Sequence, residues 1–158
     1  MRDEEQFSAA MVRYRDTVFR VAYTYLRDAA DADDVTQDVF IKLYRTATCF
    51  ESDEHLRRWL IHVAINTCKS LFRTPWRRVE DIESYADKLA MPTCEHRRIF
   101  VDVMRLPERY RVPLMLYYYC GFTTDETAHL LHVPAATVRT RMARGRRRLK
   151  ELMEGENA

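Results

Sequence analysis

The feature that most restricts the fold is the segment 123–152, which predicts two helices joined by a tight turn. Thr123 and Glu126 have the spacing of a capping box, in which a hydroxyl and a carboxylate three residues apart each bond the other's backbone amide. The short helix that they begin ends at His132-Val133-Pro134. The longer helix that follows carries one apolar stripe: Val138, Met142, Gly145, Leu149 and Leu152. Together these elements predict a helix-turn-helix.

Basic residues are concentrated on this last helix. Seven Arg and Lys residues lie between Arg139 and Lys150 with no acid among them, although the net charge of the whole chain is only +2. At 100° per residue, Thr140, Arg144 and Arg147 lie opposite the apolar stripe. Arginine forks there can bond guanine edges in a major groove, and a basic helix attracts a polyanion. The alternative is a basic face that is only solvated, but this alternative does not explain the preceding cap and turn, which a DNA-reading helix needs.

The first part of the chain predicts a bundle of three helices. The first has an apolar stripe and ends near Arg27; the stripe comprises Phe7, Met11, Tyr14, Val18, Val21 and Tyr25. Asp31 is the expected N-cap of the second helix and Ser52 of the third, which Thr74-Pro75 ends. The third helix is expected to face inward through Leu56, Leu60, Val63, Thr67 and Leu71.

The pattern predicts an all-α fold made of two small helical domains. We expect one domain over residues 1–74, a linker over 75–98 with a partly formed helix around 82–89, and a second domain over 99–158. Three glycines and five prolines are too few for a loop-rich β architecture. The four cysteines are dispersed, and the five histidines form no metal-ligand pair with a carboxylate. We therefore expect no catalytic residue, no metal and no cofactor.

No stretch of the sequence reaches the roughly 20 apolar residues of a membrane span, and the first residues have no apolar signal segment. These observations predict a cytoplasmic protein without membrane insertion.

Two sets of motifs carry a resemblance to a known family. The stretches LPERYR (106–111), GFTTDE (121–126) and TVRTR (137–141) resemble region 4 of the extracytoplasmic-function (ECF) sigma factors of the sigma-70 family. The stretches DVTQDVFIKLYR (34–45) and WLIHVAINT (59–67) are similar to region 2 of the same group. The resemblance spans nearly the whole chain, and both modules in this order are highly specific.

The resemblance implies three sets of binding residues. Region 4 would read the −35 promoter element through Thr137, Arg139, Thr140, Arg141, Arg144 and Arg147. Region 2 would capture the unpaired −10 strand through Phe50, Arg57, Arg58, Trp59, Asn66 and Lys69, although Phe50 and Trp59 are equally compatible with a core role. Asp34, Gln37 and Asp38 would contact the clamp helices of the largest subunit of core RNA polymerase.

The resemblance therefore implies a sigma factor that binds core polymerase, recognises both elements and promotes DNA opening, without being an enzyme. It also implies contact with the flap of the second-largest polymerase subunit and regulation by an anti-sigma factor. Three positions depart from the family pattern: Tyr117, where an arginine often contacts the −35 backbone, His132 and Gly145. The alternative is a stand-alone helix-turn-helix regulator with an N-terminal dimerisation bundle, which leaves the match over residues 34–45 unexplained.

Overall fold

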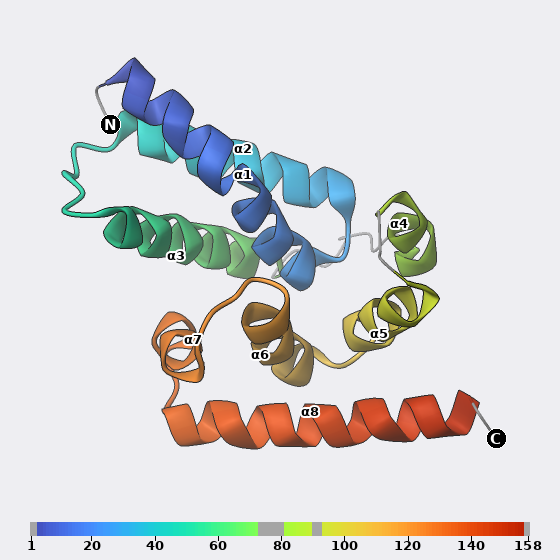
Figure 1. Cartoon of the computed structure of the whole chain (residues 1–158). Coiled ribbons are helices and arrows are strands. Elements are labelled where there is room, and N and C mark those ends of the chain that lie inside the picture. Colours follow the sequence, from blue (N-terminus) through green and yellow to red (C-terminus); the bar gives the residue numbers. More distant parts are fainter. Residues whose placement is uncertain (1–2, 73–80, 90–92, 157–158) are drawn as a thin grey trace. The chain divides into compact units, whose positions relative to one another are not determined.

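The computed structural model describes residues 3–72, 81–89 and 93–156, and these residues form eight helices and no strand. The chain divides into two compact units, residues 1–79 and 80–158. The first unit contains α1 (Glu4–Leu26), α2 (Ala29–Arg45) and α3 (Asp53–Phe72). The second contains α4 (Ile82–Lys88), α5 (Cys94–Met104), α6 (Glu108–Tyr118), α7 (Thr124–Leu131) and α8 (Ala135–Glu156) (Figure 1). The all-α prediction is confirmed.

In the first unit, α1 packs along α2 and α3, and the three helices share one core. The predicted stripe of α1 is buried from Tyr14 through Tyr25. The helix ends where predicted, because Arg27 adopts a left-handed conformation (φ 52°) and its backbone N–H donates to the carbonyl of Tyr23 at 2.8 Å.

The N-cap of the second helix differs from the prediction. The N-cap of α2 is Asp28, not Asp31: the Asp28 carboxylate accepts from the Asp31 amide at 2.9 Å. The link between α1 and α2 is only two residues long, so Asp31 already lies inside the first turn.

The predicted inner face of α3 was also partly wrong. Ser52 does begin the helix, since its hydroxyl accepts from the His55 amide at 3.1 Å. Beyond Leu60, however, Val63, Thr67 and Leu71 are only half-buried, and the fully buried side chains are Ile61, Ala64, Ile65 and Cys68. Because α3 packs against both α1 and α2, it buries a face displaced from the simple stripe.

In the second unit, the helix-turn-helix has its predicted caps. The Thr123 hydroxyl accepts from the Glu126 amide at 3.1 Å, and the Glu126 carboxylate accepts from the Thr123 amide at 3.0 Å. His132 ends α7 in the left-handed region with φ 56°. The helix expected around residues 82–89 is α4, which packs on α5, and both helices belong to the second unit.

Gly145 lies where α8 crosses α6. A Cβ at this position would lie 2.8 Å from Cδ1 of Leu114 and 3.2 Å from Cβ of Tyr110. Ordinary carbon contacts are about 3.5–4.0 Å, so glycine allows the two helices to approach more closely than alanine would. The departure from the family pattern at this position is therefore a packing feature.

Candidate nucleic-acid and partner interfaces

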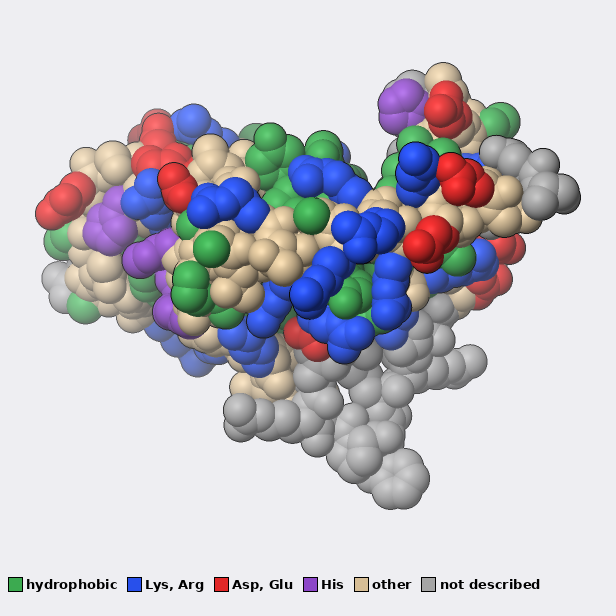
Figure 2. Space-filling view, turned by 90° about the horizontal axis from the view of Figure 1, so that it is seen from below, with side chains coloured by type: hydrophobic (Ala, Val, Ile, Leu, Met, Phe, Trp, Pro, Cys, Tyr) green, Lys and Arg blue, Asp and Glu red, His purple; other side chains and the backbone are tan. Residues whose placement is uncertain are grey.

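The face of α8 opposite its buried stripe is cationic. Val138, Met142 and Gly145 are buried against the rest of the second unit. The residues predicted from the sequence to read DNA fall into two classes: Arg139, Thr140, Arg144 and Arg147 are exposed, whereas Thr137 and Arg141 are half-buried. Figure 2 looks onto α8 and shows Lys and Arg side chains gathered along it. The exposed set has the residue types and the helical spacing needed for contacts in a major groove.

One flank of α8 is supported by tyrosines of α6. Nε of Arg146 donates to the Tyr118 hydroxyl at 3.0 Å, and the guanidinium lies 5.5 Å from the centre of the Tyr118 ring. The rings of Tyr117 and Tyr118 meet edge to face at 4.8 Å, and both side chains are exposed. Tyr117, which stands where the family often has arginine, thus packs on Tyr118, the residue that Arg146 of α8 contacts.

The predicted −10 residues form two groups on α3 and the preceding loop. The rings of Phe50 and Trp59 meet edge to face at 5.5 Å, and both residues are half-buried. Trp59, Asn66 and Lys69 have spacings of seven and three residues, which place them on one face of α3. Asn66 is exposed, and its side chain makes no hydrogen bond to any described residue.

Arg57 and Arg58 both pair with the same carboxylate. Each places a guanidinium nitrogen 3.4 Å from Oε1 of Glu54. Arg58 is the more exposed of the two, with 54% of its side-chain surface accessible against 21% for Arg57. Arg58 is therefore better placed to reach an external phosphate.

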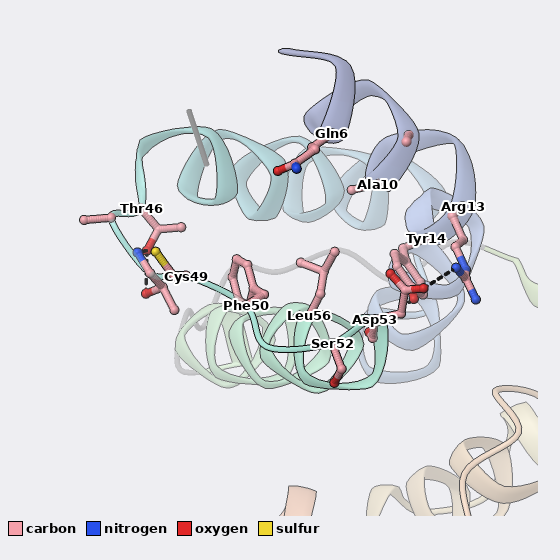
Figure 3. A pocket seen from close by; sticks show the side chains of 13 residues that line it. Gln6, Ala10, Arg13, Tyr14, Thr46, Cys49, Phe50, Ser52, Asp53 and Leu56 are labelled. Carbon is pink, nitrogen blue, oxygen red and sulfur yellow. Dashed lines mark hydrogen bonds and ion pairs between the residues drawn. The ribbon is translucent and has the colours of Figure 1, made fainter. Parts of the chain in front are cut away.

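A hollow of about 870 Å³ lies between α1, the loop 46–52 and the start of α3. Figure 3 shows Gln6 and Ala10 entering it from α1, and Phe50 and Leu56 from the loop and α3. At one end, the Arg13 guanidinium pairs with the Asp53 carboxylate at 2.8 Å.

The same end of the hollow is closed by a buried tyrosine. The Tyr14 hydroxyl donates to the Asp53 carbonyl at 3.2 Å, and burial raises the pKa of that hydroxyl above its ordinary value. Of the predicted −10 residues, only Phe50 lines the hollow. The sequence did not point to several polar residues that line the hollow, among them Arg13, Thr46 and Thr48. The polar loop between two helices was a signal for the last two.

The predicted polymerase-facing residues lie together on α2. Asp34, Gln37 and Asp38 are all exposed, and their spacing of three and four residues places them on one face. Beside them lies an apolar groove of about 860 Å³ between α1 and α2; its lining includes Phe7, Met11, Val12, Gln37, Phe40, Ile41 and Tyr44. Val12 is 89% exposed and Tyr44 55%. Exposed apolar side chains grouped in this way are typical of a protein interface.

Within the described residues, no group of three or more His, Cys, Asp or Glu side chains is close enough to hold a metal ion. None of the helices described has the length and apolar character needed to cross a membrane.

Comparison with known proteins gives matches over both units. The Sigma-70 region 2 family matches residues 11–78, and the Sigma-70 region 4 family matches residues 103–149. The ECF RNA polymerase sigma factor SigM of Mycobacterium tuberculosis is 31% identical over 157 residues, covering 96% of this chain and 79% of SigM. The RNA polymerase sigma-H factor of Pseudomonas aeruginosa is 28% identical over 170 residues, covering 96% of this chain and 88% of that protein.

Two solved structures share the fold. The sigma factor RpoE of Bartonella quintana, in complex with the anti-sigma factor NepR, aligns with a TM-score of 0.74 at 19% identity, covering 95% of this chain and 98% of that one. CnrH, in complex with the cytosolic domain of CnrY, aligns with a TM-score of 0.72 at 24% identity, covering 97% of this chain and 90% of that one.

Proposed function

Because the chain belongs to the extracytoplasmic-function group of the sigma-70 family of RNA polymerase sigma factors, we propose that its two units divide promoter recognition between them. The family assignment made from the motifs is confirmed. Sigma factors of this family bind core RNA polymerase and promoter DNA during transcription initiation, and they are not enzymes. The alternative of a stand-alone regulator does not account for the region 2 match.

The second unit is proposed to read the −35 element through α8. The supporting observation is that the exposed face of α8 carries Thr140, Arg144 and Arg147 while its opposite face is buried. Each arginine that bonds both acceptors of a guanine contributes about 1–3 kcal/mol of discrimination. Arg139 and Arg146, on one flank, are suited to phosphates, which fix the register of the helix without reading sequence.

The first unit is proposed to trap the unpaired −10 strand. A flipped base costs a few kcal/mol to unstack, and a protein pocket must recover that cost by stacking and by hydrogen bonds to the base edge. The hollow beside the loop 46–52 has an aromatic wall in Phe50 and polar atoms in Thr46 and Thr48, so it suits an extruded base. Asn66 and Lys69, further along α3, are proposed to contact the adjacent nucleotides.

Core polymerase is proposed to dock on α1 and α2. Asp34, Gln37 and Asp38 supply acceptors for a cationic partner, and such charges give orientation and fast encounter more than raw affinity. The apolar groove beside them supplies surface that becomes buried on binding. This combination fits the clamp helices of the largest polymerase subunit, and the second unit is proposed to meet the flap of the second-largest.

An anti-sigma factor is proposed as the regulator of this chain. The support is that a solved structure with the same fold is a complex of a sigma factor with an anti-sigma factor. Such a partner would compete with polymerase and DNA for the surfaces described above.

Run-off transcription with purified bacterial core polymerase on a library of promoter fragments tests the division of roles. Transcripts are expected from fragments that share −35 and −10 elements, and only when the chain is present. Arg144→Ala is expected to relax the preference within the −35 element alone. The division of roles is wrong if Arg144→Ala instead weakens use of every promoter equally.

A further inference from the structure

A second hollow, of about 560 Å³, lies in the second unit between α6 and α8. Its walls come from Arg109 and Tyr110 of α6 and from Ala136, Thr137, Thr140, Arg141 and Arg144 of α8. Three guanidinium groups and two threonine hydroxyls therefore line one cavity, and none of the described residues that line it is acidic. The guanidinium groups offer hydrogen-bond donors and an excess of positive charge, whereas the Thr140 hydroxyl already donates to the Ala136 carbonyl at 3.0 Å.

The three arginines are not neutralised by the protein. Within the described part of the chain, Arg109, Arg141 and Arg144 form no ion pair with Asp or Glu. The guanidinium of Arg109 lies 4.8 Å from the centre of the Tyr110 ring, within the range of a cation–π contact, and both residues line the hollow.

The hydroxyl of Tyr110 is also affected by this field. A hydrogen bond from Arg109, together with the positive charges of Arg109, Arg148 and Arg144, holds the pKa of that hydroxyl below its ordinary value. The hollow thus favours a negative charge.

We propose that this hollow holds a backbone phosphate of the −35 duplex, clamped between Arg109 of α6 and Arg141 of α8. The inference rests on the proposed role of α8 in reading the −35 element. The hollow is bounded by Thr140 and Arg144, which belong to the proposed reading face, so it opens beside the groove that the helix would enter. Guanidinium forks match phosphate oxygens geometrically as well as in charge.

The clamp adds a contact from outside the helix-turn-helix. Arg109 lies at the start of α6, whereas every predicted −35 residue lies on α8. A phosphate held from two helices fixes how far α8 enters the groove and its angle, and carries no sequence information. Arg109 is therefore a DNA-positioning residue, and Arg144 keeps its proposed contact with a base.

The test measures the affinity of holoenzyme, assembled from the full chain and bacterial core polymerase, for a promoter fragment selected by run-off transcription. Loss of one phosphate contact reduces the slope of log affinity against log salt by about 0.9. Arg109→Ala is therefore expected to weaken DNA binding. Because its slope is smaller, the affinity of the parent holoenzyme divided by that of the variant should fall about 3.5-fold between 50 and 200 mM salt. Arg109→Lys, which keeps the charge, is expected to restore most of the slope.

Arg105→Ala is the matched control, because Arg105 is an exposed arginine of the same unit that does not line the hollow. The proposal predicts an unchanged slope for this control and an unchanged preference among −35 sequences for Arg109→Ala. It is overturned if Arg109→Ala behaves like the control, if it alters preference at one base position, or if it weakens association with core polymerase in the absence of DNA. Failure of the parent holoenzyme to prefer any −35 sequence would instead refute the proposed function.

Discussion

Replacing Gly145 by alanine sets helix propensity against packing, and the structure indicates which effect prevails. Alanine is favoured over glycine inside a helix by about 1 kcal/mol. The new Cβ, however, would lie 2.8 Å from Cδ1 of Leu114 and 3.2 Å from Cβ of Tyr110. Leu114 is 2% exposed, so its side chain has no solvent to move into, and the Tyr110 Cβ is fixed to the backbone of α6. Overpacking of this kind costs about 1–3 kcal/mol.

We therefore expect Gly145→Ala to destabilise the protein by about 1 kcal/mol, measured by urea denaturation followed by circular dichroism. In a Leu114→Ala background, where the closest atom is gone, the same substitution is expected to be neutral or stabilising, giving a coupling energy of about 1 kcal/mol or more. Gly155→Ala is the control, because a Cβ there meets no atom within 4 Å. The packing argument is refuted if Gly145→Ala stabilises the protein in the parent background.

Three further outcomes follow from the described geometry. Asn66→Ala is expected to reduce promoter opening, measured by permanganate reactivity of unpaired thymines, while holoenzyme binding to the closed duplex stays within about twofold; equal losses in both assays would contradict a role in strand capture. Asp38→Arg is expected to weaken association with core polymerase about tenfold, roughly 1.4 kcal/mol, in a direct binding assay. The same change at exposed Glu95, on α5 and outside the proposed docking surface, is the control that should have little effect. His132→Gly is expected to raise the free energy of unfolding by up to about 1 kcal/mol, because His132 has a φ of 56°; a loss of stability would show that its side chain contributes more than its backbone strain costs.

Features encoded by neighbouring residues were predictable from the sequence. The capping box of Thr123 and Glu126 depends on a separation of three residues. The stripe predicted on α8 from helical periodicity is buried from Val138 to Gly145, but Leu149 is half-buried and Leu152 is 44% exposed. The exposed positions of Thr140, Arg144 and Arg147 followed from the same periodicity. The predicted N-cap Asp31 was wrong. The N-cap of α2 is Asp28, and its position depends on where α1 ends.

Features formed by distant segments were not predictable in this way. The hollow beside the loop 46–52 needs Arg13 from α1, which belongs to none of the quoted motifs. The hollow between α6 and α8 needs Arg109, which lies in the LPERYR stretch, but that stretch does not show that Arg109 meets α8. The buried face of α3 was misjudged because two partner helices, which periodicity does not show, decide which side of Leu60 turns inward. From the sequence alone, Gly145 is only a weak helix former. Its packing role depends on Leu114, which lies on another helix.

The crowding of positive charge on α8 has a cost for the free protein. Arg144 and Arg148, like Arg146 and Lys150, stand four residues apart, and each such like-charged pair weakens a helix by roughly 0.2–0.5 kcal/mol. Dissolved salt screens this repulsion. Higher ionic strength should therefore weaken binding to a promoter and, at the same time, stabilise α8 in the unbound protein. Promoter phosphates act in the same direction, so bound DNA serves as a counterion that stabilises the helix that reads it.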